Sequence, residues 1–428
     1  MSILTVLGGP GRRGVVLMNQ SSWDHTLQGV RPSPGPGRGA VSPQSSRDKR
    51  AKRSLPGSTV RREGSAISEL ETLRNGSTGL ASPTVVAADP VSDPRWRQLA
   101  TSPDAGLFTS PPWIAAVCGT YGFTAQSRVA LDPAGTPLGG VAWVTVDDPR
   151  GRRLLSLPFS DRADPPVPDT ATWDLVFDAV ETGGAPYTLR CLDSSPARHG
   201  AGLRVVGEAA WHGTPLDADV DELHRRIDGR ARRHDAAAGR AGVRVDVRDD
   251  LAAVQVMHGL HVRLRKNKYG LLAQPQEFFA RIWREFAPDG RCHTLLASVG
   301  DEVVAAALFL EWNGALYYKF GASVLGRLEL RPNDAIYWAA IRLGVERGLH
   351  LVDWGLSDLD QPGLVRFKRA WASEERRLLT LRHGSADPTP AQREFGDVLG
   401  GLTGLLTGEA VADETTAAAG ALLYRYFC

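Results

Sequence analysis

The chain has few cysteines and lacks a long apolar run. Its four cysteines lie far apart, with no Cys-x-x-Cys pair and no histidine at metal-ligand spacing: Cys118, Cys191, Cys292 and Cys428. They predict neither a disulfide framework nor a metal centre, and they fit a reducing cytoplasm. The longest obvious apolar run, Val303 to Leu310, is far shorter than the roughly 18 residues that span a bilayer. It suits a buried strand, so the sequence predicts no transmembrane segment.

A secretion signal is also missing. Met1 to Leu7 is followed by Gly-Gly-Pro-Gly-Arg-Arg-Gly in place of a sustained apolar core, so we expect no export. The 428 residues are 42% hydrophobic and 23% charged, with a formal net charge of +2. This composition is typical of a soluble enzyme, and the length predicts two or more domains, because one domain has roughly 150 residues. We expect a cytoplasmic protein and make no prediction of its oligomeric state.

Residues 1–83 are rich in Gly, Pro, Ser and Arg and have almost no apolar periodicity. This composition predicts a disordered extension. The basic run Arg47 to Arg53, with Arg61 and Arg62, could contact nucleic acid or an anionic membrane surface through charge alone. A solvated tail, or sequence upstream of the true translation start, is the preferred interpretation.

The remaining sequence predicts an α/β fold in two units, 84–214 and 246–385. A basic segment, 215–245, connects them, and 386–428 is expected to be a helical tail. The expected helices are 112–121, 172–182, 251–264, 276–286, one from about 333 to 348, and 392–406. The expected strands are 127–131, 141–147, 153–157, 187–192, 293–299, 303–312, 315–320 and 350–354, with a hairpin turn at Val299 to Glu302.

The stretch from Tyr317 to Ala370 combines a strand, a helix N-terminus, a second strand and a lysine loop. Asn333 is the expected N-cap of the helix, which Gly348 closes. The second strand ends near Asp353, and a loop from Gly363 to Trp371 carries Lys368. Because two strand ends and a helix N-terminus converge here, we predict a group-transfer site.

These residues carry a family resemblance. Tyr-Lys-Phe-Gly-Ala-Ser, Arg-Pro-Asn, Asp-x-Gly-x-Ser and Gly-Leu-x-x-Phe-Lys-x-x-Trp follow one another here, in an order that resembles the FemAB-like branch of the GNAT acyltransferases. The similarity extends upstream through His261 to Arg265, Gln274 to Phe279 and Leu295 to Ala297, and in weaker form to Leu157 to Asp161. It covers roughly residue 84 to the C-terminus, and it implies tandem GNAT-like domains with mixed sheets flanked by helices.

The resemblance also implies roles for particular residues. Lys368 is expected to assist acyl transfer, because a cation can stabilise the negative charge that develops on the carbonyl oxygen, and Phe367 and Trp371 could desolvate it. Tyr318 and Lys319 point to opposite faces of a strand, so at most one faces the cleft, and the family favours Tyr318. Asp353 could hold a substrate amine or act as a base. A structural carboxylate, and a lysine extending along a helix surface, are the competing interpretations.

Other residues are candidates for anion binding. Arg331 and the amides after Asn333 could dock a phosphate or carboxylate, although a simple helix cap explains them equally well. The basic segment from Arg225 to Arg240, with Arg230 as its representative, could bind phosphates, or it could be a solvated helix face. Arg265, within the His261 to Arg265 motif, is a further candidate contact. His258 and His261 lack a third ligand, so no metal site is expected.

The donor is harder to predict. The GNAT pyrophosphate loop is not clear, since Leu325 to Arg331 holds a single glycine. Members of the family use acyl-CoA or take an amino acid from aminoacyl-tRNA to extend peptidoglycan stem peptides. No heptad-bearing helical arm is present, which favours acyl-CoA and an amine acceptor on a small molecule or cell-envelope precursor. The alternatives are a tRNA-dependent cell-wall ligase and a non-catalytic module that binds nucleic acid or another anionic ligand.

Overall fold

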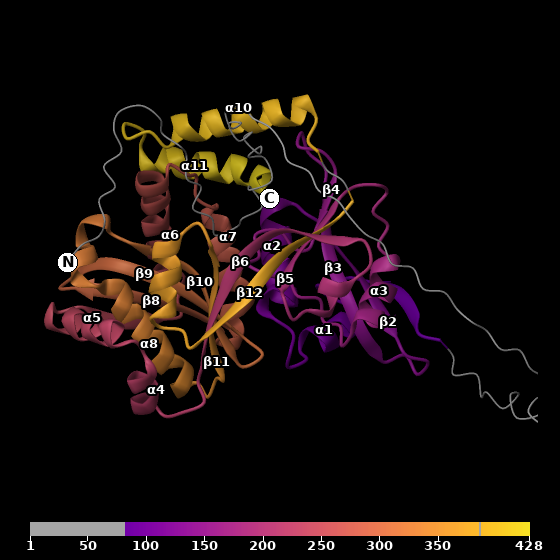
Figure 1. Cartoon of the computed structure of the whole chain (residues 1–428). Coiled ribbons are helices and arrows are strands. Elements are labelled where there is room, and N and C mark those ends of the chain that lie inside the picture. Colours follow the sequence, from indigo (N-terminus) through magenta and orange to yellow (C-terminus); the bar gives the residue numbers. More distant parts are fainter. Residues whose placement is uncertain (1–81, 385–386) are drawn as a thin grey trace, which may run out of the picture. The chain divides into compact units, whose positions relative to one another are not determined.

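The computed structural model describes residues 82–384 and 387–428 (Figure 1). The basic run of the N-terminal extension, and nearly all of the segment predicted to be disordered, residues 1–83, fall outside the described residues. Within the described residues, twelve strands form one mixed sheet in the order β1-β2-β3-β4-β5-β12-β6-β11-β10-β9-β8-β7. The predicted α/β fold class is confirmed.

The strands have the following bounds: β1 Thr84–Ala88, β2 Ala125–Leu131, β3 Pro137–Val146, β4 Arg153–Leu155, β5 Tyr187–Leu192, β6 Leu203–Pro215, β7 Arg244–Arg248, β8 Cys292–Val299, β9 Glu302–Trp312, β10 Ala315–Ser323, β11 Leu351–Asp358 and β12 Glu374–His383. The α-helices are α1 Pro94–Ala100, α2 Pro111–Tyr121, α3 Thr170–Asp178, α4 Val220–Arg226, α5 Gly229–Arg240, α6 Leu251–Leu264, α7 Gln276–Phe286, α8 Pro332–Glu346, α9 Pro362–Arg369, α10 Pro390–Leu406 and α11 Asp413–Leu423.

Helices cover both faces of the C-terminal strands. In β9, Ala306, Leu308 and Leu310 pack in a core cluster with residues of α2, α6 and α7. The alternate residues Ala307 and Phe309 pack in a second cluster with α5 and α8. This alternation explains why β9 reads as an unbroken apolar run, because both of its faces are buried.

Two long strands tie the halves of the sequence together. β12 comes from the C-terminal half but lies between β5 and β6, with antiparallel partners on both sides, as Figure 1 shows. β6 in turn pairs with β11. Sequence analysis missed both strands. The predicted domain boundaries stay predictions, although one continuous sheet runs through both predicted units.

The parallel strands β10 and β11 separate after a short contact. Their pairing involves only Ala315 to Tyr317 and Leu351 to Asp353, although both strands continue well beyond it. β10 has a register shift between Tyr318 and Phe320. β11 has one between Asp353 and Leu356, where Gly355 takes a left-handed φ of 70°. Such bulges bend strands, and here they open a gap in the sheet.

Several local predictions are confirmed. Helices 251–264 and 276–286 and strand 187–192 have the predicted bounds, and Val299 pairs with Glu302 in the β8–β9 hairpin. Side-chain caps explain some helix starts, since Asp250 accepts a hydrogen bond from the Ala253 amide.

Two local predictions are wrong. Asn333 is not the N-cap of α8, because the helix begins at Pro332 and Arg331 is the cap residue. Proline suits the first helical turn, where its missing N–H costs nothing. The stretch expected to be a loop around Lys368 is the helix α9. Its short length and its glycine made the helical periodicity hard to see.

Candidate active site

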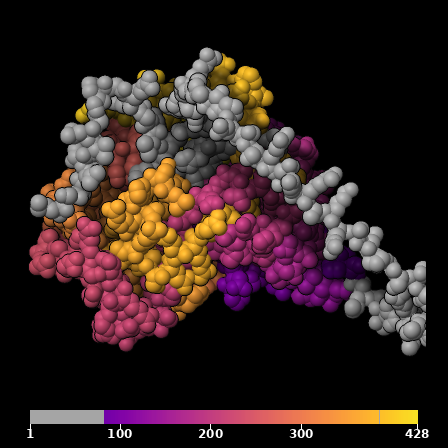
Figure 2. All heavy atoms as spheres, in the orientation of Figure 1, coloured from indigo at the N-terminus to yellow at the C-terminus, as the bar shows by residue number. Residues whose placement is uncertain are grey.

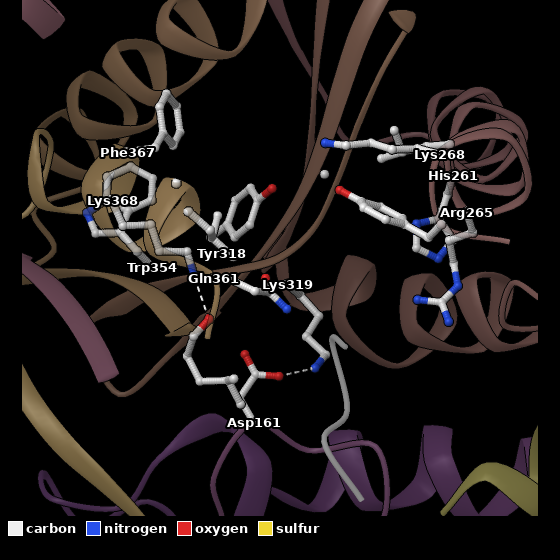
Figure 3. Close-up of a pocket in the computed structure, with 16 residues that line it drawn as sticks. Asp161, His261, Arg265, Lys268, Tyr318, Lys319, Trp354, Gln361, Phe367 and Lys368 are labelled. Carbon is white, nitrogen blue, oxygen red and sulfur yellow. Dashed lines mark hydrogen bonds and ion pairs between the residues drawn. The ribbon is translucent and has the colours of Figure 1, made fainter. Parts of the chain in front are cut away.

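A cavity of about 400 Å³ lies at the gap between β10 and β11, and we call it the strand-gap cavity. In Figure 3, Phe367 and Lys368 of α9 lie on one side, His261 and Arg265 lie on the other, and Tyr318 lies between them. The lining residues are Asp161, His261, Leu264, Arg265, Lys268, Tyr269, Tyr318, Lys319, Gly321, Trp354, Leu356, Gln361, Gly363, Leu364, Phe367 and Lys368. The cavity therefore contacts helices from both faces of the sheet.

Lys368 is buried in the wall of this cavity. Its Nζ donates a hydrogen bond of 2.6 Å to the carbonyl oxygen of Leu356, next to the β11 irregularity. Burial lowers the pKa of Lys368 to about 8, although the carboxylates of Asp161, Asp353 and Asp358 oppose that shift. At neutral pH the side chain is thus a partly desolvated ammonium that can give up its proton.

Lys319 and Asp161 form a second charged element of the cavity. Lys319 Nζ lies 2.6 Å from Asp161 Oδ1, and its side chain is 1% exposed. It also donates to the Phe159 carbonyl at 3.2 Å and lies 4.9 Å from the Phe108 ring centroid. The loop that presents Asp161 has left-handed residues, since Leu157 and Phe159 both have φ of 60°.

The expectation that only one of Tyr318 and Lys319 faces the cleft is wrong. Both line the strand-gap cavity, because the register shift makes Lys319 an extra residue opposite β9 and interrupts the regular alternation of faces. Tyr318 packs its ring 5.4 Å from that of Tyr337. Burial raises the pKa of the Tyr318 hydroxyl, so it remains a neutral hydrogen-bonding group.

Asp353 and Trp371 lie beside the cavity and do not line it. Asp353 is within β11, not at a strand end. One of its oxygens accepts a hydrogen bond from the Gly355 amide at 2.8 Å, and the other lies 3.4 Å from Arg162. Burial raises the pKa of Asp353. Trp371 is 2% exposed and belongs to the apolar core.

Cations outnumber acids in the cavity wall. Arg265 donates a hydrogen bond from Nε to the Leu272 carbonyl at 2.5 Å. Arg265 and Lys268 belong to the π-helix Arg265–Tyr269. Together with Lys319 and Lys368 they face one carboxylate, Asp161. An anionic group is therefore the expected ligand of this wall.

A second cavity of about 570 Å³ lies on the other side of α9, and we call it the arginine cavity. Its lining residues are Asp228, Arg230, Ala231, His234, Asp334, Gly363, Arg366, Phe367, Arg369 and Ala370. Figure 2 shows the pink α4–α5 region beside the orange region that includes α9. Gly363 and Phe367 line both cavities, so the two cavities are neighbours.

The structure thus brings together some of the predicted residues and separates others. Lys368, Tyr318, Phe367 and Arg265 line the strand-gap cavity, and Arg230 lines the arginine cavity. Arg331 and Asn333 line neither cavity. The Asn333 side-chain oxygen accepts a hydrogen bond from the Ser323 hydroxyl at 2.7 Å.

Sequence reasoning missed Lys319 and Asp161 as site residues. Both lie in motifs that carried the resemblance. Lys319 lies in Tyr-Lys-Phe-Gly-Ala-Ser, and Asp161 lies in the motif from Leu157 to Asp161, which was the available signal for it. No group of three metal-binding side chains occurs in residues 82–384 and 387–428. His258 and His261 instead both contact Gln274, at 3.0 and 2.8 Å.

Part of the chain matches a known protein family. Residues 224–369, which contribute most of the lining of both cavities, match the family model described as an acetyltransferase (GNAT) domain. The chain therefore carries a GNAT domain, and it is an acyltransferase. The predicted GNAT resemblance is confirmed.

The crystal structure of FemX shares the fold. The chain is 14% identical to the crystal structure of FemX, with a TM-score of 0.53 over 66% of this chain and 93% of that one. It is 15% identical to a tandem GNAT protein from the clavulanic acid biosynthesis pathway, with a TM-score of 0.44 over 72% of this chain and 100% of that one. For L-PGS from Bacillus licheniformis, the identity is 12% and the TM-score 0.43, over 76% and 99% of the chains. No curated protein sequence matches the chain.

Proposed function

We propose that this acyltransferase moves an acyl group from an acyl-CoA thioester to an amine held in the strand-gap cavity. One observation carries the proposal: parallel strands β10 and β11 stop pairing after three residues each, and the gap contains a buried lysine. Beyond that contact, the facing edges of β10 and β11 carry backbone N–H and C=O groups that pair with no strand among the described residues. Such groups suit the amide-bearing arm of coenzyme A, because they can pair with its amides as a strand would.

The chemistry needs a neutral amine and a stabilised oxyanion. The amine nitrogen attacks the thioester carbonyl, a C–N bond forms, the C–S bond breaks, and the proton lost by the amine goes to the thiolate. We assign the Lys368 ammonium to the oxygen that gains negative charge in this step. A pKa of about 8 means that the ammonium form is retained at neutral pH and lost in mild alkali.

The cationic wall defines the acceptor class. Lys319 is paired with Asp161, the one acid among the described lining residues. Arg265, Lys268 and Lys368 therefore give the wall an excess of positive charge. Guanidinium and ammonium groups bind carboxylates and phosphates with charge-assisted hydrogen bonds. We therefore propose an amine that also carries an anionic group, on a small molecule or a cell-envelope precursor.

A turnover assay tests the proposal. The full chain is mixed with acetyl-CoA and a panel of anionic amines, and released thiol is measured. Lys368→Met should lower kcat by about 10²- to 10³-fold, the usual range for losing one oxyanion contact, with a smaller change in KM. Arg240→Gln is the control, because it removes a cation that lines neither cavity.

Four outcomes are informative. Loss of kcat in Lys368→Met with a native melting curve supports the assignment, and unchanged kcat overturns it. Transfer only from aminoacyl-tRNA would replace acyl-CoA with the alternative donor. No transfer from either donor would contradict the proposed function.

A further inference from the structure

We propose that the arginine cavity binds the phosphate groups of the acyl donor through arginine side chains, in place of the backbone amides at the start of α8. The inference rests on the proposed function, because it takes acyl-CoA as the donor. It adds a binding site, its residues and its ligand chemistry.

The start of α8 is poorly built for an anion. Pro332 has no N–H, and the amides of Asp334 and Ala335 both donate to the Arg331 carbonyl, at 3.1 and 3.3 Å. In the first turn, only Asn333 keeps an N–H without a partner among the described residues. The Asp334 carboxyl group, 5% exposed, adds a negative charge at the same turn. Backbone amides and the helix dipole therefore offer a phosphate little here.

The neighbouring cavity supplies what the helix start lacks. Arg230 comes from α5 and Arg366 from α9, and both line the arginine cavity. Neither guanidinium forms an ion pair or hydrogen bond with another described residue. Arg369, in contrast, is held by both oxygens of Glu375, at 2.5 and 2.6 Å. Two uncommitted guanidinium groups on facing helices fit a pyrophosphate, because each can give paired N–H bonds to phosphate oxygens.

The position of the cavity fits one ligand that reaches both sites. Phe367 and Gly363 separate the arginine cavity from the strand-gap cavity and line both. A donor can thus keep its phosphates beside Arg230 and Arg366 while its thioester lies near Lys368. Gly363 offers no side chain at this passage, and a Cβ there would meet open space.

Asp334 makes phosphate binding depend on pH. Burial raises the pKa of Asp334 to about 7, Arg331 opposes the shift, and Asp235 adds to it. His234 Nδ1 lies 3.5 Å from its Oδ1, and burial lowers the pKa of His234. The charged and titratable groups of the cavity and around this carboxyl are Asp228, Arg230, His234, Asp235, Arg331, Arg366 and Arg369. A bound phosphate repels the carboxylate, so affinity falls as pH rises through about 7.

Binding of coenzyme A itself tests the proposal without turnover. Isothermal titration of the full chain at fixed salt compares the wild type with Arg230→Gln, Arg366→Gln and Arg240→Gln. We expect each cavity variant to raise the Kd for coenzyme A about tenfold, since a charge-assisted hydrogen bond is worth that much or more. Arg240→Gln, on the same helix but outside the cavity, should bind as the wild type does.

Acetyl-pantetheine, which has no phosphate, is the second probe. Its affinity should be the same in all four proteins. Asp334→Asn should bind coenzyme A more tightly at pH 8 and flatten the dependence on pH. Because Arg230 and Arg366 are exposed, their variants should melt like the wild type, so weaker binding reflects a lost contact.

Unchanged Kd for coenzyme A in both arginine variants would overturn the inference. If the wild type still acetylates an amine from acetyl-CoA in that case, the proposed function stands while this site fails. If an RNA minihelix binds through Arg230 and Arg366 and coenzyme A does not bind, the phosphates belong to RNA and the inference is also overturned. If coenzyme A binding needs both arginines but no acyl transfer occurs, the site stands and the proposed function fails.

Discussion

Lysine is scarce in this chain, and three lysines line one cavity. The sequence has six lysines, of which Lys268, Lys319 and Lys368 line the strand-gap cavity. Lys319 has a carboxylate partner at 2.6 Å, whereas Lys368 has a neutral carbonyl at 2.6 Å. The two lysines therefore have different roles. Lys319 is held in an ion pair and is structural, whereas Lys368 has no carboxylate partner at this distance among the described residues and is available to a reacting oxygen.

The charge of Lys368 should lower the stability of the fold below pH 8. Its folded pKa is about 8, against an unpaired value of 10.5. Between these values the unfolded chain binds one more proton, so the free energy of unfolding rises with pH. The loss of folding stability is fully present below pH 8 and absent above pH 10.5, and it lowers the free energy of unfolding by about 3 kcal/mol.

Urea unfolding of the wild type and Lys368→Met at pH 7, 8, 9 and 10 measures this effect. The wild type should gain stability relative to the variant as pH rises, because methionine cannot titrate. A constant difference between the two proteins across this range would show that the Lys368 pKa is not lowered.

Asp161 should be worth more to stability than an exposed acid. Asp161→Asn leaves the buried Lys319 ammonium without its counter-charge, which typically costs about 3 kcal/mol or more when one partner of a buried pair is removed. The double variant Asp161→Asn with Lys319→Met removes the orphaned charge and should recover part of the loss. Chemical denaturation measures all three proteins, and equal losses in the single and double variants would contradict the buried-pair account.

At the scale of elements, the irregularity in β11 shapes the site. Gly355 has φ of 70°, and a Cβ at this position would lie 2.6 Å from Asp161 Oδ2. Any side chain here therefore meets both backbone strain and Asp161, the one acid among the described residues that line the cavity. The same bend separates β11 from β10, so Gly355 accounts for both the irregularity in β11 and the gap in the sheet.

Gly355→Ala should destabilise the protein by about 2 kcal/mol or more and reduce turnover. Left-handed backbone costs an alanine roughly 1–2 kcal/mol, and displacement of Asp161 adds to that. Gly348→Ala is the matched control, because Gly348 has φ of 67° and open space around its Cβ position. Thermal melting and the thiol assay measure both variants. Equal effects on stability and no loss of turnover in Gly355→Ala would show that Asp161 is not disturbed.

The α9 helix is the other element that matters for the site. It places Phe367 between the two cavities and turns Lys368 toward β11, where the Leu356 carbonyl accepts its hydrogen bond. A loop at this position, as sequence analysis expected, would leave the lysine without a fixed direction. The helix supplies the orientation that an oxyanion contact needs.

At the scale of the whole molecule, strand exchange joins the two halves. β12 comes from the C-terminal half, and both of its partners, β5 and β6, come from the N-terminal half. The sheet therefore depends on residues 374–383 for the continuity of its centre.

No described helix is long and apolar enough to cross a membrane.

Residues 84–214 alone should fail to fold cooperatively. This fragment lacks β12, so one edge of β5 and both edges of β6 would expose unpaired backbone groups. The full chain should melt in one transition followed by circular dichroism and by tryptophan fluorescence. The matched fragment 246–385 lacks β6 and should also fail. A sharp, native-like melting transition in either fragment would show that the halves are independent.

The sequence alone determined what local patterns can encode. Apolar periodicity gave α6, α7 and β5 their bounds, and the ordered motifs identified the GNAT resemblance and brought Lys368, Tyr318 and Phe367 forward. These features depend on neighbours within a few residues, so they can be predicted from the sequence alone. The N-cap of α8 and the α9 helix were mispredicted because proline and glycine signals compete there.

Only the tertiary structure decided which distant groups meet. Asp161 and Lys319 are 158 residues apart in sequence, yet they form one ion pair because a loop of the N-terminal half reaches the gap between β10 and β11. Burial then gives Lys368 its lowered pKa, and the packing of α5 and α9 brings Arg230 and Arg366 to one cavity. Charge, burial and strand pairing across such distances have no signature in local sequence, because they arise from the packing of the whole sheet.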